Sequence, residues 1–139
     1  MMMSVSLRAI KECENRRHPQ LAAEHYLLSL VHEQAEDPDV SAILREIGIT
    51  YEALNQVLMS MVPPNSHAPH SNPPDHFLTE ALERAKVQAG QMVHEEVDSR
   101  HLLWGILGDP RNNAVIALMT MGVDVGRLKD RTMEFLMAD

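Results

Sequence analysis

Two stretches of the chain, HPQLAAEHYLLSLV at residues 18–31 and HEEVDSRHLLWGIL at residues 94–107, decide the fold. Each begins with a histidine and carries a second histidine seven residues later. Each then enters an apolar stretch that has a small residue at the same place, Ser29 in the first and Gly105 in the second. Similarity between two parts of one chain at a fixed offset indicates an internal repeat.

The similarity continues after these stretches. Asp-Pro at 37–38 corresponds to Asp-Pro at 109–110, and IGIT at 47–50 corresponds to MGVD at 121–124. The offset changes in the connecting loop, at residues 32–36 against 108, where a duplicated fold tolerates a change of length. We therefore interpret residues 4–61 as repeat one and residues 77–137 as repeat two, within a single domain that covers residues 1–139.

Capping residues divide each repeat into helices. Asp37 and Asp109 are each followed by proline, which is typical of a helix N-cap and first helical residue. Gly48 and its counterpart Gly122 follow apolar runs, where the residue after a helix takes a positive φ. The spacing predicts an all-α fold, an eight-helix bundle of two pseudo-twofold four-helix repeats, with helices at 4–15, 22–33, 38–47, 50–61, 78–91, 99–107, 110–121 and 125–137.

A proline-rich linker at residues 62–76 separates the repeats and is not expected to form a helix or a strand. It contains His67, His70 and His76, which could hold a transition metal weakly. Neither a cysteine nor a paired carboxylate completes a tetrahedral site there, so we predict no metal.

Charge and composition exclude several partners. The chain has 12 basic and 20 acidic side chains and a net charge of -8, whereas nucleic-acid binding needs Lys and Arg gathered on one face. No apolar run has the length of a membrane span, and no signal peptide is evident. Cys13 is the single cysteine, which is typical of a reducing compartment. We expect a cytoplasmic protein with neither a nucleic-acid nor a membrane partner.

The ordered set of repeated residues resembles the N-terminal domain of Clp-type AAA+ unfoldases. The resemblance is carried by EHYLLSLV at 24–31 and RHLLWGIL at 100–107, each followed by a Gly-Ile or Gly-Val-Asp turn at Gly48 and Gly122. It implies a non-catalytic domain that binds substrates, unfolded proteins or adaptors for a Clp-type ATPase. The chain contains no Gly-x-x-x-x-Gly-Lys-Ser/Thr loop, so ATP hydrolysis by that mechanism is excluded.

The resemblance also implies candidate binding residues. In some family members a glutamate in each repeat binds phosphorylated arginine, beside a small hydroxyl residue. The corresponding residues here are Glu24 with Ala23 in repeat one and Arg100 with Ser99 in repeat two. Because Arg100 would repel a guanidinium, we expect Glu24 and Arg100 to form a rim of charge around an apolar surface near the repeat junction, rather than two phosphoarginine sites.

Other reactive side chains have structural interpretations. His25 and His101 are expected to fix a helix start by hydrogen bonding, and Cys13 to be a small buried hydrophobe. The acidic groups around Asp37 and Asp98 are expected to be solvated. The methionines fill irregular cores or line adaptable binding grooves, and core packing is the favoured interpretation.

The predicted function is protein recognition for a Clp-type unfoldase or protease, with no catalytic residue and no cofactor. One alternative is a free-standing regulatory or decoy protein that acts without an ATPase. A second is a metal-dependent factor that uses the linker histidines.

Overall fold

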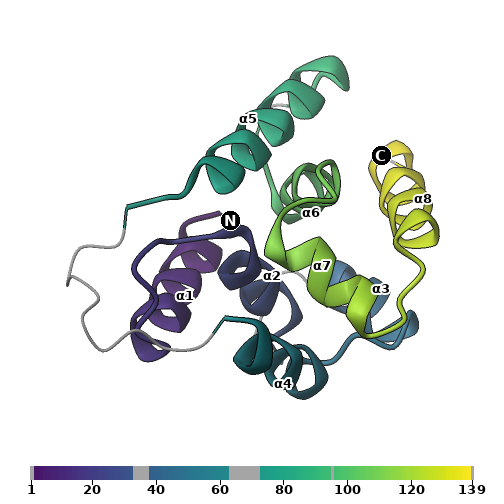
Figure 1. Ribbon diagram of the computed structural model, residues 1–139. Coiled ribbons are helices and arrows are strands. Elements are labelled where there is room, and N and C mark those ends of the chain that lie inside the picture. Colours follow the sequence, from purple (N-terminus) through teal and green to yellow (C-terminus); the bar gives the residue numbers. More distant parts are fainter. Residues whose placement is uncertain (1, 33–37, 63–72, 95, 139) are drawn as a thin grey trace.

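The computed structural model describes residues 2–32, 38–62, 73–94 and 96–138. These residues form eight helices and no strand, apart from one isolated bridge between Leu21 and Pro74. The all-α prediction is confirmed (Figure 1). The helices are α1 (Met2–Asn15), α2 (Ala23–Val31), α3 (Pro38–Glu46), α4 (Tyr51–Met61), α5 (His76–Gln91), α6 (Ser99–Leu107), α7 (Asn113–Thr120) and α8 (Val125–Met137).

The predicted capping residues lie where expected between the third and fourth helices of each repeat. Gly48 and Gly122 have φ values of 94° and 82°, which an L side chain rarely adopts. Thr50 and Asp124 then accept hydrogen bonds from backbone N–H groups three residues on, at 3.2 and 3.1 Å. These contacts start α4 and α8 at equivalent places, as the repeat requires.

The start of α7 differs from the prediction. Asn112, not Asp109, is the N-cap, and its side chain accepts from the Val115 N–H at 3.0 Å. Asp109 instead accepts from the backbone and the guanidinium of Arg111, at 2.9–3.0 Å. Hydrogen bonds from Arg111 lower the pKa of Asp109 to about 2. The proposed helix start at Pro110 is therefore wrong, and Asp37, its counterpart, lies outside the described residues.

The linker boundary also moves. His76, assigned to the linker from the sequence, is the first residue of α5. Asp75 is its N-cap and accepts from the Leu78 N–H at 2.8 Å, so the linker ends at residue 75, before His76. Residues 63–72, which include His67 and His70, lie outside the described residues.

Each repeat begins with a tightly packed helix pair, α1 with α2 and α5 with α6. In repeat one, Ser29 donates a hydrogen bond to the Val5 carbonyl oxygen at 2.8 Å. In repeat two, Gly105 lies directly against the Ala81 backbone, where even a Cβ would overlap the carbonyl oxygen. The small residue that the repeat pattern singled out is therefore the contact point of both pairs.

One hydrophobic cluster spans both repeats, and α2, α6 and α7 lie at its centre (Figure 1). The bridge at Leu21 adds a backbone link, since its N–H and C=O bond to the segment just before α5 at 2.9 Å. Within the described part of the chain, no helix has the length and apolar content needed to cross a bilayer.

The predicted role of methionine in the core is wrong for three positions. Met59, Met119 and Met137 are 62%, 49% and 70% exposed, while Met61 and Met121 pack partly buried against the core. Leucine, alanine, valine and isoleucine supply most of the buried side chains instead, because close helix contacts favour compact residues with few rotamers.

Candidate functional site

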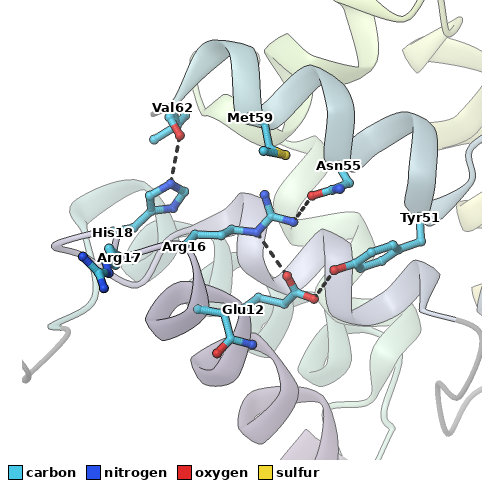
Figure 2. Close-up of a pocket in the computed structure, with 9 residues that line it drawn as sticks. Glu12, Arg16, Arg17, His18, Tyr51, Asn55, Met59 and Val62 are labelled. Atoms are coloured by element: carbon cyan, nitrogen blue, oxygen red, sulfur yellow. Dashed lines mark hydrogen bonds and ion pairs between the residues drawn. The ribbon is translucent and has the colours of Figure 1, made fainter. Parts of the chain in front are cut away.

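A groove of about 590 Å³ lies between the end of α1, the turn that follows it and α4. Figure 2 shows side chains from these elements around one hollow. We call it the α1/α4 groove. Its volume falls in the range of pockets that hold small molecules or single peptide side chains. It is lined by Glu12, Asn15, Arg16, Arg17, His18, Tyr51, Asn55, Met59 and Val62.

The floor of the α1/α4 groove is a closed polar network. The Glu12 carboxylate accepts from Arg16 Nε at 3.1 Å and from the Tyr51 hydroxyl at 2.5 Å. Arg16 Nη2 also donates to the side-chain oxygen of Asn55 (Figure 2). Burial and the hydrogen bond to Glu12 raise the pKa of Tyr51, so its hydroxyl keeps its proton. The network fixes these four side chains in place before any ligand arrives.

The upper edge of the groove is apolar and open. Met59 is 62% exposed on α4, above the guanidinium of Arg16, and Val62 follows at the end of the same helix. Arg17 lies beside His18 in the turn after α1 (Figure 2), with a φ of 55°, a left-handed conformation that closes α1. An exposed methionine beside a preorganised polar floor is suited to holding an apolar side chain in a fixed orientation.

A pair of histidines supports the back of the groove. The backbone N–H of Ala22 donates to Nδ1 of His25 at 2.9 Å, so the hydrogen of this ring is on Nε2. That nitrogen donates to Nδ1 of His18 at 2.7 Å, and Nε2 of His18 donates to the Val62 carbonyl at 2.9 Å. The chain of bonds ties the start of α2 to the end of α4.

Repeat two contains the same histidine pair. The Asp98 N–H donates to Nδ1 of His101 at 2.9 Å, and Nε2 of His101 lies 2.7 Å from Nδ1 of His94. His25 and His101 therefore fix the starts of α2 and α6, as predicted. In each pair the first histidine lies before the helix and bonds to the second histidine, which lies in the first turn of that helix.

The four residues singled out from the sequence are largely buried, so Glu24 and Arg100 form no exposed rim of charge. Ala23, Glu24 and Ser99 are 1%, 4% and 3% exposed, and the Arg100 side chain is 12% exposed. They lie at the starts of α2 and α6, the helices at the centre of the bundle. Binding by these residues stays a prediction, and it requires that they first become exposed.

Glu24 and Arg100 have partners within the chain. Asn113 Nδ2 donates to the Glu24 carboxylate at 3.3 Å, and burial raises the pKa of Glu24. Arg100 pairs with Asp98 through Nε and Nη2 at 2.8–3.2 Å and lies 5.4 Å from the centre of the Phe135 ring. Burial favours a raised pKa for Asp98, but hydrogen bonds from Arg100 lower it overall. Both charges serve internal contacts in this structure.

Nucleophile and metal chemistry find little support among the described residues. Cys13 is fully buried, and its thiol donates to the carbonyl oxygens of His18 and Gln20 at 3.4 Å. Burial raises the pKa of Cys13 to about 11, so the thiol is not an activated nucleophile. No group of three His, Cys, Asp or Glu side chains within the described ranges could hold a metal ion.

Comparison with known proteins links repeat two to a family. The Clp repeat (R) N-terminal domain family matches residues 75–138. The N-terminal domain of Hsp104 from Candida albicans superposes on 96% of this chain and 87% of its own, with a TM-score of 0.78 at 15% identity. That of ClpD from Arabidopsis thaliana covers 96% of this chain and 93% of its own, with a TM-score of 0.77 at 18% identity. Repeat two therefore belongs to the Clp N-terminal domain family, and the whole chain has the fold of these domains.

A third similar structure is a ClpV N-domain in complex with a VipB peptide. It covers 95% of this chain and 82% of its own, with a TM-score of 0.67 at 22% identity. The predicted fold is thus confirmed for the chain, and the predicted family is confirmed for residues 75–138. At these identities the likeness carries the fold, and the ligand of this chain must be argued from its own residues.

Sequence reasoning missed the α1/α4 groove. Glu12 and Arg16 are spaced as an i, i+4 ion pair, which was a usable signal on α1. Tyr51 and Asn55 come from a helix far along the chain, and nothing local indicates that they meet α1. Core packing is the favoured interpretation of Met59 from the sequence, because methionine suits a core and a groove alike.

Proposed function

We propose that this chain is a non-catalytic recognition domain that binds a segment of a substrate or adaptor protein for a Clp-type unfoldase. The observation that carries the proposal is the α1/α4 groove, a preorganised polar floor with the exposed Met59 at its edge. Grooves that combine fixed polar groups with a soft apolar wall hold peptide side chains well. The ClpV N-domain, which shares the fold, has been solved with a peptide from a partner protein.

The groove is a better candidate than the starts of α2 and α6. A ligand reaches Met59 without any movement of the chain, whereas Glu24 is 4% exposed and hydrogen-bonded to Asn113. Reaching Glu24 would require α7 to move away from α2, and these two helices pack within one core. We therefore place recognition at α4 and α1 rather than at the junction of the repeats.

The test is quantitative affinity capture with the purified chain and two matched variants. Met59→Asp places a charge in the groove, and Met137→Asp places the same charge on α8, where the side chain is 70% exposed. We expect a Clp-type ATPase, or its substrates and adaptors, to be lost with Met59→Asp and kept with Met137→Asp. Equal recovery with both variants would remove the groove as the recognition site, provided that circular dichroism shows both to be folded.

A further inference from the structure

Among the side chains of the α1/α4 groove that form its floor, more hydrogen-bond donors than acceptors remain uncommitted. Both oxygens of Glu12 already accept hydrogen bonds, and so does the side-chain oxygen of Asn55. Arg16 uses Nε and Nη2 in these contacts, which leaves three of its five N–H groups. The side-chain NH₂ of Asn55 is also uncommitted within the described part of the chain. A ligand that fits must bring acceptors.

The charge of the groove points the same way. Glu12 and Arg16 compensate each other in an ion pair at 3.1 Å. His18 is uncharged in its hydrogen-bonded form, because Nδ1 accepts from His25. Arg17 adds a positive charge and makes no ion pair with any described residue, on a chain whose net charge is -8. The groove is thus a local positive region that attracts a negative group.

The apolar edge of the groove restricts the kind of ligand that can bring this negative group. Met59 offers exposed thioether and methylene surface, and Val62 continues it toward His18. A free inorganic anion would satisfy Arg17 and Arg16 and leave this surface in water. A peptide segment with an aliphatic side chain next to a carboxylate satisfies both at once.

We infer that the α1/α4 groove binds a partner-protein segment that contains Asp or Glu beside an aliphatic residue. The carboxylate accepts hydrogen bonds from Arg17 and from the uncommitted N–H groups of Arg16 and Asn55. The aliphatic side chain packs on Met59. This inference rests on the proposed function, and it adds the chemistry of the segment that is recognised.

Repeat two does not reproduce this groove. By the alignment of His18 with His94, Glu12 and Arg16 correspond to Gln88 and Met92, and Arg17 corresponds to Val93. By the alignment of the caps Thr50 and Asp124, the counterparts of Tyr51 and Asn55 are Val125 and Lys129. The carboxylate–guanidinium–hydroxyl floor is therefore present in repeat one alone, and binding saturates at one segment per chain.

The test is an NMR titration of the chain with short peptides that differ only at two central positions. The pairs are Leu-Asp, Leu-Asn, Leu-Lys and Ser-Asp, in one frame of small polar residues. We expect Leu-Asp to shift the Asn55 side-chain amide and to saturate at one peptide per chain. Each of the other pairs binds more weakly, and Arg17→Glu weakens Leu-Asp by about tenfold and favours Leu-Lys. Arg127→Glu makes the same charge change on the exposed face of α8 and leaves the preference intact.

The remaining outcomes separate the two proposals. If Leu-Asp and Leu-Lys bind equally and Met59→Asp abolishes both, the groove is a recognition site but the acidic preference is overturned. If Arg127→Glu changes the preference as much as Arg17→Glu does, the preference reflects overall charge and is likewise overturned. If no pair shifts Asn55, or if Met59→Asp leaves the shifts unchanged, both proposals fail.

Discussion

The hydrogen between His18 and His25 is carried by Nε2 of His25, which lies 2.7 Å from Nδ1 of His18. This follows because Nδ1 of His25 already accepts from the Ala22 N–H. Both rings are uncharged in this arrangement, and a proton added to either would break one bond of the chain that ends at the Val62 carbonyl.

Acid should therefore destabilise the fold through His25. Burial, followed by the electrostatic effects of His18 and Arg16, lowers the pKa of His25 from 6.5 to about 3. The unfolded chain then binds more protons than the folded chain between these values, so stability is complete above about pH 6.5 and is lost toward pH 3. Urea unfolding should show a loss on the order of 1 kcal/mol between pH 6.5 and about pH 5.

The control for this prediction is His76→Gln, because His76 is exposed at the start of α5. This variant should lose stability over the same pH range as the unmodified chain. Acid sensitivity that disappears with His76→Gln would show that an exposed histidine, rather than the buried pair, is responsible.

Glu24→Gln should stabilise the fold at neutral pH. Burial raises the pKa of Glu24, so the folded chain holds this proton more tightly than the unfolded chain and loses that advantage as pH rises through the raised pKa. The amide keeps an acceptor for Asn113 and removes the cost of a buried charge. We expect a gain of about 1 kcal/mol near pH 8 that vanishes near pH 4.

Exposed Glu14→Gln is the matched control for Glu24→Gln and should change the unfolding free energy little at either pH. A destabilised Glu24→Gln at neutral pH would mean that the ionised carboxylate is itself required by the fold.

Gly105→Ala should destabilise the α5–α6 pair. An added Cβ would overlap the Ala81 carbonyl oxygen, so the helices must separate, at a cost of about 1–3 kcal/mol. Gly90 lies in α5 with open space around its Cα, and Gly90→Ala should gain up to about 1 kcal/mol from helix propensity. Thermal unfolding of the two variants measures the difference, and equal midpoints would contradict the close packing of α5 on α6.

Val93→Gly should raise stability. Val93 has a φ of 57°, which costs a β-branched residue about 1–2 kcal/mol, and it is 87% exposed, so little packing is lost. Its counterpart Arg17 closes α1 in the same way, with a φ of 55°. We expect a gain of about 1 kcal/mol in denaturant unfolding, and a loss would mean that the Val93 side chain makes a stabilising contact.

The sequence predicted best where the determinants are local. The positive φ of Gly48 and Gly122 and the caps at Thr50 and Asp124 each depend on a few consecutive residues. The start of α7 was mispredicted by a local signal of the same kind, because Arg111 takes the carboxylate of Asp109 and leaves the cap to Asn112.

The burial of Glu24 and the α1/α4 groove depend on contacts between distant residues, which no local sequence pattern indicates. Glu24 is buried because α2 lies at the centre of the bundle and α7 covers it, which the repeat alone does not reveal. The α1/α4 groove depends on Tyr51 reaching Glu12 from another helix. Methionine is equally compatible with core and groove, so the exposure of Met59 could be learned only from the assembled fold.

The central claim is that the α1/α4 groove receives polypeptide segments, and site-specific photo-crosslinking tests it most directly. A photoreactive residue would replace Met59, and in separate chains Met119 or Met137, which are also exposed but lie on α7 and α8. We predict protein crosslinks predominantly from position 59, with acidic and aliphatic residues enriched in the attached segments. Crosslinks of equal yield and composition from all three positions would contradict the claim.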